Sequence, residues 1–357
     1  MKHPFGISTV VGIGIILCMI SCGSAPPSST PASEEEGPHN ETVQELTSVK
    51  ERTKNARKLA EDFEGPVSYP DEWNSAESRY AQAEALKPGS EQAYQEAIET
   101  YTALEDSYNA IALKAIFHYK EQRDQVLQKA REEALEAGAA ALLPEVLDRA
   151  DNTAAAALSR YEAQDYYAFA QESAMTEALY VLLKTEASAL GIRLEIETHN
   201  LSRFDPQTFA AAEAYMQQVA SAYEGKDMAL AQQDATAALA QYQQVADTGW
   251  EALAEEQRQR VKALREEAVN LKAPAAMKTA FEEADSIYTE GEGFMSAKDF
   301  KQALELFTQG ADQFAAVRDA TMKKRQTAEK AIKTAQDKIA DSDKRAKSAQ
   351  AKLGGIR

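Results

Sequence analysis

The chain has 357 residues, of which 44% are hydrophobic, and a formal net charge of −18 at pH 7. This length and apolar content allow a sizeable buried surface, either in one core or distributed along a repeat. The negative charge argues against nucleic-acid binding, because affinity for a phosphate backbone comes mainly from lysine and arginine. The charge is uneven: from Lys323 onward there are 11 Lys/Arg and 4 Asp/Glu, so this segment carries +7 and the preceding chain −25.

Residues 1–21 have the composition of a secretion signal. Lys2 precedes an apolar run of 16 residues, 5–20, which is shorter than the roughly 20 residues of a membrane-spanning helix. The Met-Ile-Ser-Cys sequence that follows, at residues 19–22, resembles the lipobox of bacterial lipoprotein precursors. That resemblance implies that Cys22 is lipidated and becomes the mature amino terminus. The alternative is an ordinary cleaved signal or an uncleaved anchor.

Residues 22–40 are rich in Pro, Ser and Glu and lack apolar periodicity, which predicts a disordered tether between the lipid anchor and a folded body. Two or more acyl chains give stable membrane attachment. We therefore expect a lipoprotein of the bacterial cell envelope that faces the periplasm. The outer membrane is slightly favoured, because Gly23 and Ser24 follow the cysteine without an adjacent Asp.

Helical periodicity begins at Glu41, and from there a two-part motif recurs four times. In its first half, a proline precedes a large apolar residue at +3 and an alanine at +6. In its second half, an aromatic residue or Met precedes an alanine by three positions, and apolar residues follow that alanine at +4 and +11. Intervals of 3, 4 and 7 place these side chains on one face of a helix. The first halves are Pro70/Trp73/Ala76, Pro144/Leu147/Ala150, Pro206/Phe209/Ala212 and Pro274/Met277/Ala280, and the second halves are Tyr94/Ala97/Tyr101/Tyr108, Tyr167/Ala170/Ala174/Val181, Met228/Ala231/Ala235/Tyr242 and Phe300/Ala303/Phe307/Phe314.

A third signature lies upstream of each proline, so the repeat begins before its proline. It is an arginine followed three residues later by Ala or Ile. The interval from this arginine to the proline is the same in the first three repeats and shorter in the fourth. The arginines are Arg57, Arg131, Arg193 and Arg265.

Long stretches without a strong helix breaker join the second motif helix of one repeat to the next proline. They run from Ser90 to Ala141, from Asp165 to Asn200 and from Lys226 to Lys272. The simplest interpretation is a long helix whose first half closes one three-helix unit and whose second half opens the next.

The predicted fold is therefore all-α: an elongated array of four helical units that share long helices. We call the units repeats 1 to 4, with predicted bounds 41–112, 113–183, 184–249 and 250–322. This architecture is similar to spectrin-type three-helix rods. An alanine four residues before an aromatic, as in Ala303/Phe307, also resembles the second helix of tetratricopeptide repeats, which implies a curved superhelix as the alternative. The prolines, however, are 74, 62 and 68 residues apart, about twice the 34-residue period of that family.

Few side chains offer catalytic or metal chemistry. The Glu-x-x-His spacing at Glu36/His39 spans Gly-Pro in the tether, so a di-iron bundle is not supported. Cys18 would leave with the signal and Cys22 would be lipidated, which excludes thiolate metal sites and Cys/His catalysis. The sequence contains no glycine-rich phosphate cradle. We expect no enzymatic activity, no cofactor and no metal.

The aromatic residues suggest packing more than ligand binding. Five tyrosines occupy motif positions and are predicted in the core: Tyr94, Tyr101, Tyr108, Tyr167 and Tyr242. Three others fall late in the first motif helices of repeats 2 to 4, on a rim that a partner could contact. These candidate binding residues are Tyr161, Tyr223 and Tyr288.

Residues 323–357 form a predicted basic helix after the array. Apolar and small residues recur at alternating intervals of 4 and 3, which is a heptad seam. We weigh a solvated single helix against a seam that docks on an acidic helical partner, such as the body of a second copy. The seam consists of Ala328, Ile332, Ala335, Ile339, Ser342, Ala346, Ala349 and Leu353.

Two functions fit these features. The first is a lipid-anchored scaffold or spacer that mediates contacts between envelope proteins. The second is a periplasmic lipoprotein that binds a ligand or peptide and serves a transporter.

Overall fold

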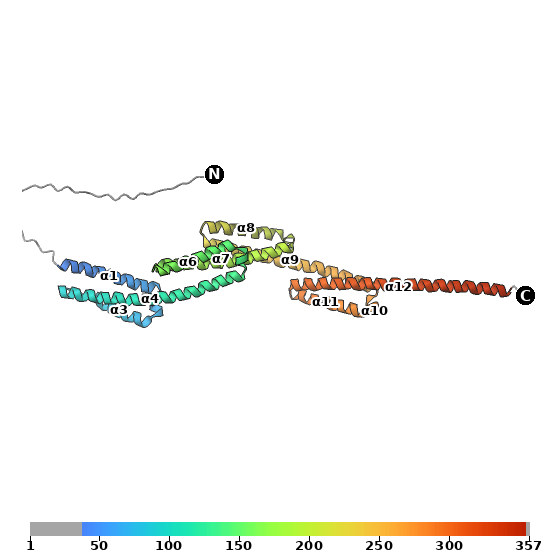
Figure 1. Ribbon diagram of the computed structural model, residues 1–357, viewed down its shortest axis with the longest axis horizontal. Helices are drawn as coiled ribbons and strands as arrows, with labels where there is room; N and C mark the ends of the chain where they lie inside the picture. Colours follow the sequence, from blue (N-terminus) through green and yellow to red (C-terminus); the bar gives the residue numbers. More distant parts are fainter. Residues whose placement is uncertain (1–37, 355–357) are drawn as a thin grey trace, which may run out of the picture. The chain divides into compact units, whose positions relative to one another are not determined.

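The computed structural model describes residues 38–354, so the predicted signal peptide, the lipidation site Cys22 and most of the tether lie outside the described residues. Residues 38–354 contain twelve α-helices, one 3-10 turn and no strand, which confirms the all-α prediction. The elements are α1 Pro38–Asp62, α2 Gly65–Ser68, α3 Pro70–Glu84, α4 Glu91–Glu136, α5 Ala139–Leu142, α6 Pro144–Glu162, α7 Tyr166–Thr198, η1 Leu201–Arg203, α8 Pro206–Glu224, α9 Met228–Asn270, α10 Ala273–Ala276, α11 Lys278–Ser296 and α12 Phe300–Gly354 (Figure 1).

The chain divides into two compact parts, one ending at Ala115 and the other beginning at Ile116. In the first part, α1, α3 and the first half of α4 form a three-helix bundle. The Thr53 hydroxyl of α1 donates to the carbonyl of Tyr101 in α4 at 3.0 Å, and Trp73 of α3 packs edge-on against Tyr108. Their fully buried neighbours Leu104 and Ile111 complete the core.

The second part repeats this bundle three times by sharing helices. The second half of α4 packs with α6 and the first half of α7, as the ion pairs of Arg131 with Asp151 and of Lys184 with Glu133 show. The second half of α7 then packs with α8 and α9, and the second half of α9 with α11 and α12. Three helices, α4, α7 and α9, have 33 to 46 residues and each serve two successive bundles, which confirms the shared-helix prediction. The helix pairs of a 34-residue tetratricopeptide repeat are too short for this arrangement.

Most helices start at a proline or directly after an aspartate. Prolines occupy the first position of α3, α6 and α8, where a missing N–H costs no intrahelical bond. α1 also begins at a proline, Pro38, three residues before the predicted start. Aspartates cap the second helices: Asp165 accepts from the amide of Ala168, and Asp227 from that of Leu230.

Each opening helix ends in a left-handed residue seven positions after the repeat arginine, followed by a single helical turn. Only one of these four residues is glycine, so the usual C-terminal glycine signal is missing from three of them. The residues, with φ between +52° and +93°, are Glu64, Gly138, Asn200 and Lys272.

The predicted first motif of repeat 4 is wrong by four residues. Pro274 lies in the single turn α10, and its partners Met277 and Ala280 are only partly buried. The helix starts instead at Lys278, and the buried residues at +3 and +6 are Phe281 and Ala284. Counted from the repeat arginine, Lys278 holds the position that proline holds in the other three repeats. The fourth repeat therefore has the same arginine spacing as the others without a proline.

The predicted second motif of repeat 2 is wrong by one residue. Tyr167, expected in the core, is 53% exposed, and Val181 is 41% exposed. The buried residues are their neighbours Phe169, Ser173 and Tyr180. Tyr166, Phe169, Ser173 and Tyr180 have the same 3, 4 and 7 spacing as the predicted set, so the apolar pattern alone could not separate two adjacent registers. Tyr101, Tyr108 and Tyr242 are buried as predicted, and Tyr94 is half-buried.

Candidate functional site

The most regular polar feature of the described chain is an ion pair between each repeat arginine and a carboxylate at a sequence separation of 20. The arginine comes from the opening helix and the carboxylate from the short middle helix. In repeat 2, Arg131 Nε and Nη2 both lie 2.8 Å from the Asp151 carboxylate oxygens. This two-point contact fixes the angle between the two helices. The four pairs are Arg57–Glu77, Arg131–Asp151, Arg193–Glu213 and Arg265–Asp285.

In repeats 1 to 3, a buried tyrosine of the third helix completes the cluster. The Tyr180 hydroxyl donates to Asp151 Oδ1 at 2.6 Å, and Tyr108 makes the same bond to Glu77 Oε1 at 2.6 Å. Tyr242 donates to Glu213 Oε1 at 2.5 Å. One carboxylate thus connects all three helices of a bundle.

The cluster keeps its carboxylates ionised. Hydrogen bonds from the Arg131 guanidinium and the Tyr180 hydroxyl outweigh burial and lower the pKa of Asp151. Burial and the Asp151 carboxylate raise the pKa of Tyr180, so its hydroxyl stays a donor. Such groups hold helices together; a general acid or base would need a pKa shifted toward neutrality.

Repeat 4 differs, because Phe314 occupies the tyrosine position and packs edge-on against Phe281 at 5.4 Å between ring centroids. A second ion pair is present there. Arg258 binds both oxygens of Glu292 at 2.7 Å, and Tyr288 also hydrogen-bonds that carboxylate, which helps lower the pKa of Glu292.

The sequence pattern reveals the repeat arginines but not their carboxylate partners. Glu and Asp alternate at this position, in a chain with 57 acidic residues, so the regular spacing does not stand out by residue type. Aligning the chain on the four arginines would have revealed it. The same alignment shows the tyrosine of repeats 2 and 3, which lies at a sequence separation of 29 from the carboxylate in both.

The three candidate rim tyrosines lie on three different helices and are half-buried. Tyr161 packs against Phe169 at 5.4 Å between ring centroids, and the guanidinium of Arg149 lies 5.1 Å from the Tyr223 ring centre. Tyr288 packs against Phe307. Tyr161 and Tyr223 are the next-to-last residues of α6 and α8, whereas Tyr288 lies in the middle of α11. The structure therefore does not bring these three residues together, and a binding role for them stays a prediction.

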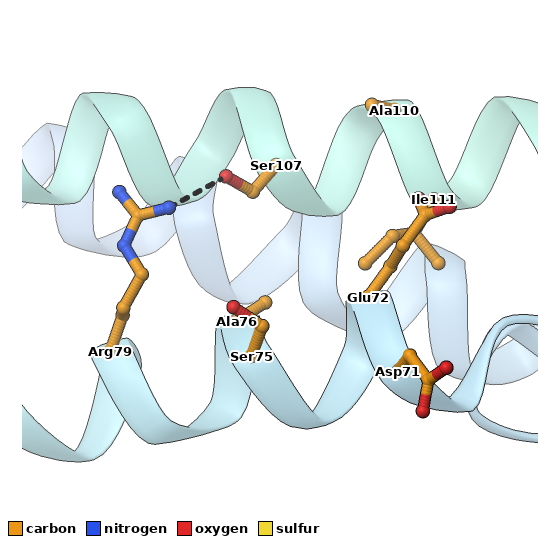
Figure 2. A pocket seen from close by; sticks show the side chains of 8 residues that line it. All are labelled: Asp71, Glu72, Ser75, Ala76, Arg79, Ser107, Ala110 and Ile111. Atoms are coloured by element: carbon orange, nitrogen blue, oxygen red, sulfur yellow. Dashed lines mark hydrogen bonds between the residues drawn. The ribbon is translucent and has the colours of Figure 1, made fainter.

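A shallow hollow of about 430 Å³ lies between α3 and α4. Figure 2 shows Arg79 at one end, hydrogen-bonded to Ser107 at 3.3 Å, and Asp71 and Glu72 at the other. The hollow is open to solvent, and Glu72 on its wall pairs with Lys114 at 2.7 Å. The hollow is a groove between two helices of one bundle.

Within residues 38–354, no helix combines the length and apolar character required to cross a membrane. Over the same range, no cluster of three or more His, Cys, Asp or Glu side chains is arranged to hold a metal ion.

The predicted carboxyl-terminal seam lies on α12, beyond its last buried side chain, Thr321. All residues from Met322 to Leu353 are exposed. Ile332, Ile339 and Leu353 are 58%, 63% and 75% exposed. These are the large apolar side chains of a helix that no described element covers.

These features define an all-helical repeat protein whose regularly spaced polar clusters join helices and whose last helix extends free of the body. Relatives of this chain include two proteins named Treponemal membrane protein A. The protein from Treponema pallidum (strain Nichols) is 28% identical over 233 residues, which are 63% of this chain and 65% of that protein. The protein from Treponema phagedenis is 24% identical over 159 residues, which are 44% of this chain and 46% of that protein.

The matched region thus spans less than two thirds of the length of either relative. No protein-family model matches the chain. No solved structure matches it either.

Proposed function

We propose that this protein is a lipid-anchored scaffold or spacer of the bacterial cell envelope, attached through acyl chains on Cys22 and facing the periplasm. The observation that carries the proposal is the repeated arginine–carboxylate cluster. Its charged groups pair with one another and join three helices, so they serve architecture and are not directed at a substrate. The proposal assigns the chain no catalytic role.

Two further observations support it. The relatives are named as membrane proteins, which fits membrane attachment through the lipobox-like sequence before Cys22. The exposed length of α12 offers a surface for protein contacts. The ligand-binding alternative gains no comparable support, because the three candidate tyrosines are on separate helices and each packs within its own surroundings.

The anchor is tested by labelling cells with a radioactive fatty acid. We expect the label on the wild-type chain and none on Cys22→Ser, with the variant released from the membrane fraction. Ser21→Ala is the matched control, because it keeps a small residue before the cysteine. Equal labelling of wild type and Cys22→Ser would overturn lipidation at this site.

The spacer role is tested by removing one repeat in register. Deleting residues 131–192 joins Ala130 to Arg193 and leaves the spacing within each remaining arginine–carboxylate pair unchanged. On a supported bilayer, the height of the protein layer measured by neutron reflection should fall. Tyr161→Ala is the control that should leave the height unchanged. An unchanged height for a folded deletion variant would contradict the spacer.

A further inference from the structure

The buried face of α12 continues, uncovered, along its exposed half. Phe307, Phe314 and Thr321 are buried and seven residues apart. The same series continues with Ala328, Ala335, Ser342 and Ala349. A second series begins at buried Ala311 and, after Arg318 and Arg325, continues with Ile332, Ile339, Ala346 and Leu353.

The apolar face of α12 extends beyond the helices that pack against it in the last bundle. In Figure 1, α12 continues beyond α10 and α11, its neighbours in the last bundle. A hollow of about 570 Å³ marks the transition, lined by Met277 of the body and by Ala328 and Ala331 of α12. The exposed segment of 32 residues is about 48 Å long. Because most helical stability in proteins comes from packing of an amphipathic face, a partner along this apolar face would stabilise the segment.

The heptad positions specify which partner fits. Position a holds Ile332, Ile339, Ala346 and Leu353, and position d holds Ala328, Ala335, Ser342 and Ala349. β-Branched residues at a are typical of two-stranded parallel coiled coils, in which leucine is the usual residue at d. The flanking g positions are Ala331, Lys338, Arg345 and Lys352, and the e positions are Glu329, Gln336, Asp343 and Gln350.

This charge pattern distinguishes the two orientations of a self-pair. In a parallel pair, each g residue meets the e residue five positions later on the other strand, so Lys338 meets Asp343 of the partner twice by symmetry. In an antiparallel pair, g residues meet g residues, which would bring Lys338, Arg345 and Lys352 against one another. Like charges brought side by side in this way repel one another and disfavour the antiparallel pair.

From these positions we infer that α12 pairs with α12 of a second copy of this chain, as a parallel two-stranded coiled coil over residues 328–353. The small residues at d, three alanines and Ser342, let the helices approach closely but bury little apolar area, so the dimer is weak and reversible. The inference does not depend on the lipid anchor, because it concerns only described residues of α12.

The sign of the salt dependence separates this pairing from docking on the acidic body. Each segment from Lys323 onward carries +7, so two paired tails repel one another overall and added salt should tighten the dimer. A basic tail docked on the acidic body of another copy would instead be weakened by salt.

The first measurement is sedimentation equilibrium of residues 23–357, which include every described helix, at about 0.05 M and about 0.5 M NaCl. We expect a monomer–dimer equilibrium that tightens at the higher salt. Ile332→Ser with Ile339→Ser should raise Kd by at least about tenfold. Ala340→Ser with Ala351→Ser, on the outer face of the same helix, should leave Kd unchanged.

The second measurement is disulfide formation, which reports the orientation. Residues 23–357 contain no cysteine, so Ala335→Cys and Ala349→Cys each introduce a single thiol at position d. In a parallel pair both should form a disulfide-linked dimer on mild oxidation, whereas Ala340→Cys should not. Cross-linking of neither d variant, a dimer that weakens with salt, or a monomer under all conditions would each overturn the inference.

Discussion

Repeats 3 and 4 form the same three-helix bundle but carry different residues at corresponding buried positions. In repeat 3, Leu201 fills the space beside Gly249, and both are buried. Seventy-two residues later, the corresponding positions in repeat 4 are Ala273 and Thr321, also buried. A large side chain and a glycine in repeat 3 thus correspond to a small side chain and a threonine in repeat 4. The comparison indicates that combined volume at a contact is preserved while the individual residues vary.

We expect the largest loss of stability from a substitution that disturbs this volume match in repeat 3. A Cβ on Gly249 would lie 2.5 Å from Leu201 Cβ, with no flexible end to move aside. Gly249→Ala should therefore lower the free energy of unfolding by about 3 kcal/mol, measured by urea denaturation.

A matched control lies in another helix. Gly191 in α7 has no atom within 4 Å of an added Cβ, so Gly191→Ala should stabilise the protein by up to about 1 kcal/mol through helix propensity. Leu201→Ala with Gly249→Thr, which copies repeat 4, should recover part of the loss. A destabilised Gly191→Ala together with a neutral Gly249→Ala would contradict the packing argument.

The second difference is Tyr242 against Phe314. Tyr242→Phe removes a hydrogen bond to the ionised Glu213 and should cost about 1.5 kcal/mol in the free energy of unfolding. Phe314→Tyr, the reverse change, puts a hydroxyl near the Arg265–Asp285 pair of repeat 4 and should cost little or nothing. Thermal unfolding of both variants measures the two changes in stability. Equal losses would show that the tyrosine hydroxyl is not a bonded part of the cluster.

A third difference lies seven residues before each repeat arginine, where repeat 4 has the paired Arg258 and repeat 3 has Glu186. Burial raises the pKa of Glu186 to about 7, with Arg149 acting in the opposite direction. An unfolded glutamate titrates near 4.3, so between about pH 4.5 and 7 the folded state binds more protons and stability falls as pH rises.

Glu186→Gln should remove this loss of stability with rising pH. We expect about 1 kcal/mol of stabilisation at pH 8, a figure reduced for solvent screening of a half-buried group, and none near pH 4. Stability curves at both pH values give the measurement. The Glu213 carboxylate acts in the opposite sense: burial raises its pKa, but hydrogen bonds from Arg193 and Tyr242 outweigh it, so its contribution is lost as pH falls below about 4.

The smallest expected effect concerns the first residue of the middle helix, Pro206 in repeat 3 and Lys278 in repeat 4. Pro206→Ala should change stability by about 1 kcal/mol or less. Lys278→Pro should be tolerated or slightly stabilising, because Met277 has φ −139° and ψ 46°, close to the −138° and 49° of Leu143 before Pro144. A loss of several kcal/mol for Lys278→Pro would show that its amide is needed.

Local patterns in the sequence were sufficient for the helical class, the shared long helices and most helix starts. Proline at a first turn, a capping aspartate and apolar intervals of 3, 4 and 7 act within a few residues of one another, so they can be recognised without tertiary contacts. The sequence also predicted the heptad seam of α12, because the spacing of its residues can be recognised whether or not a partner packs on it.

The sequence could not decide contacts between helices. It did not distinguish Tyr167 from Tyr166 as the inward residue, because two adjacent faces carried the same apolar spacing and only packing against α4 and α6 selects one of them. It assigned Pro274 to the start of a helix, although that position belongs to the preceding turn, because both sites tolerate proline. The arginine–carboxylate pairs and the exchange of Leu201/Gly249 for Ala273/Thr321 join residues that are far apart in the chain. Such pairs are defined by the three-dimensional fit of side chains, which only the tertiary structure determines.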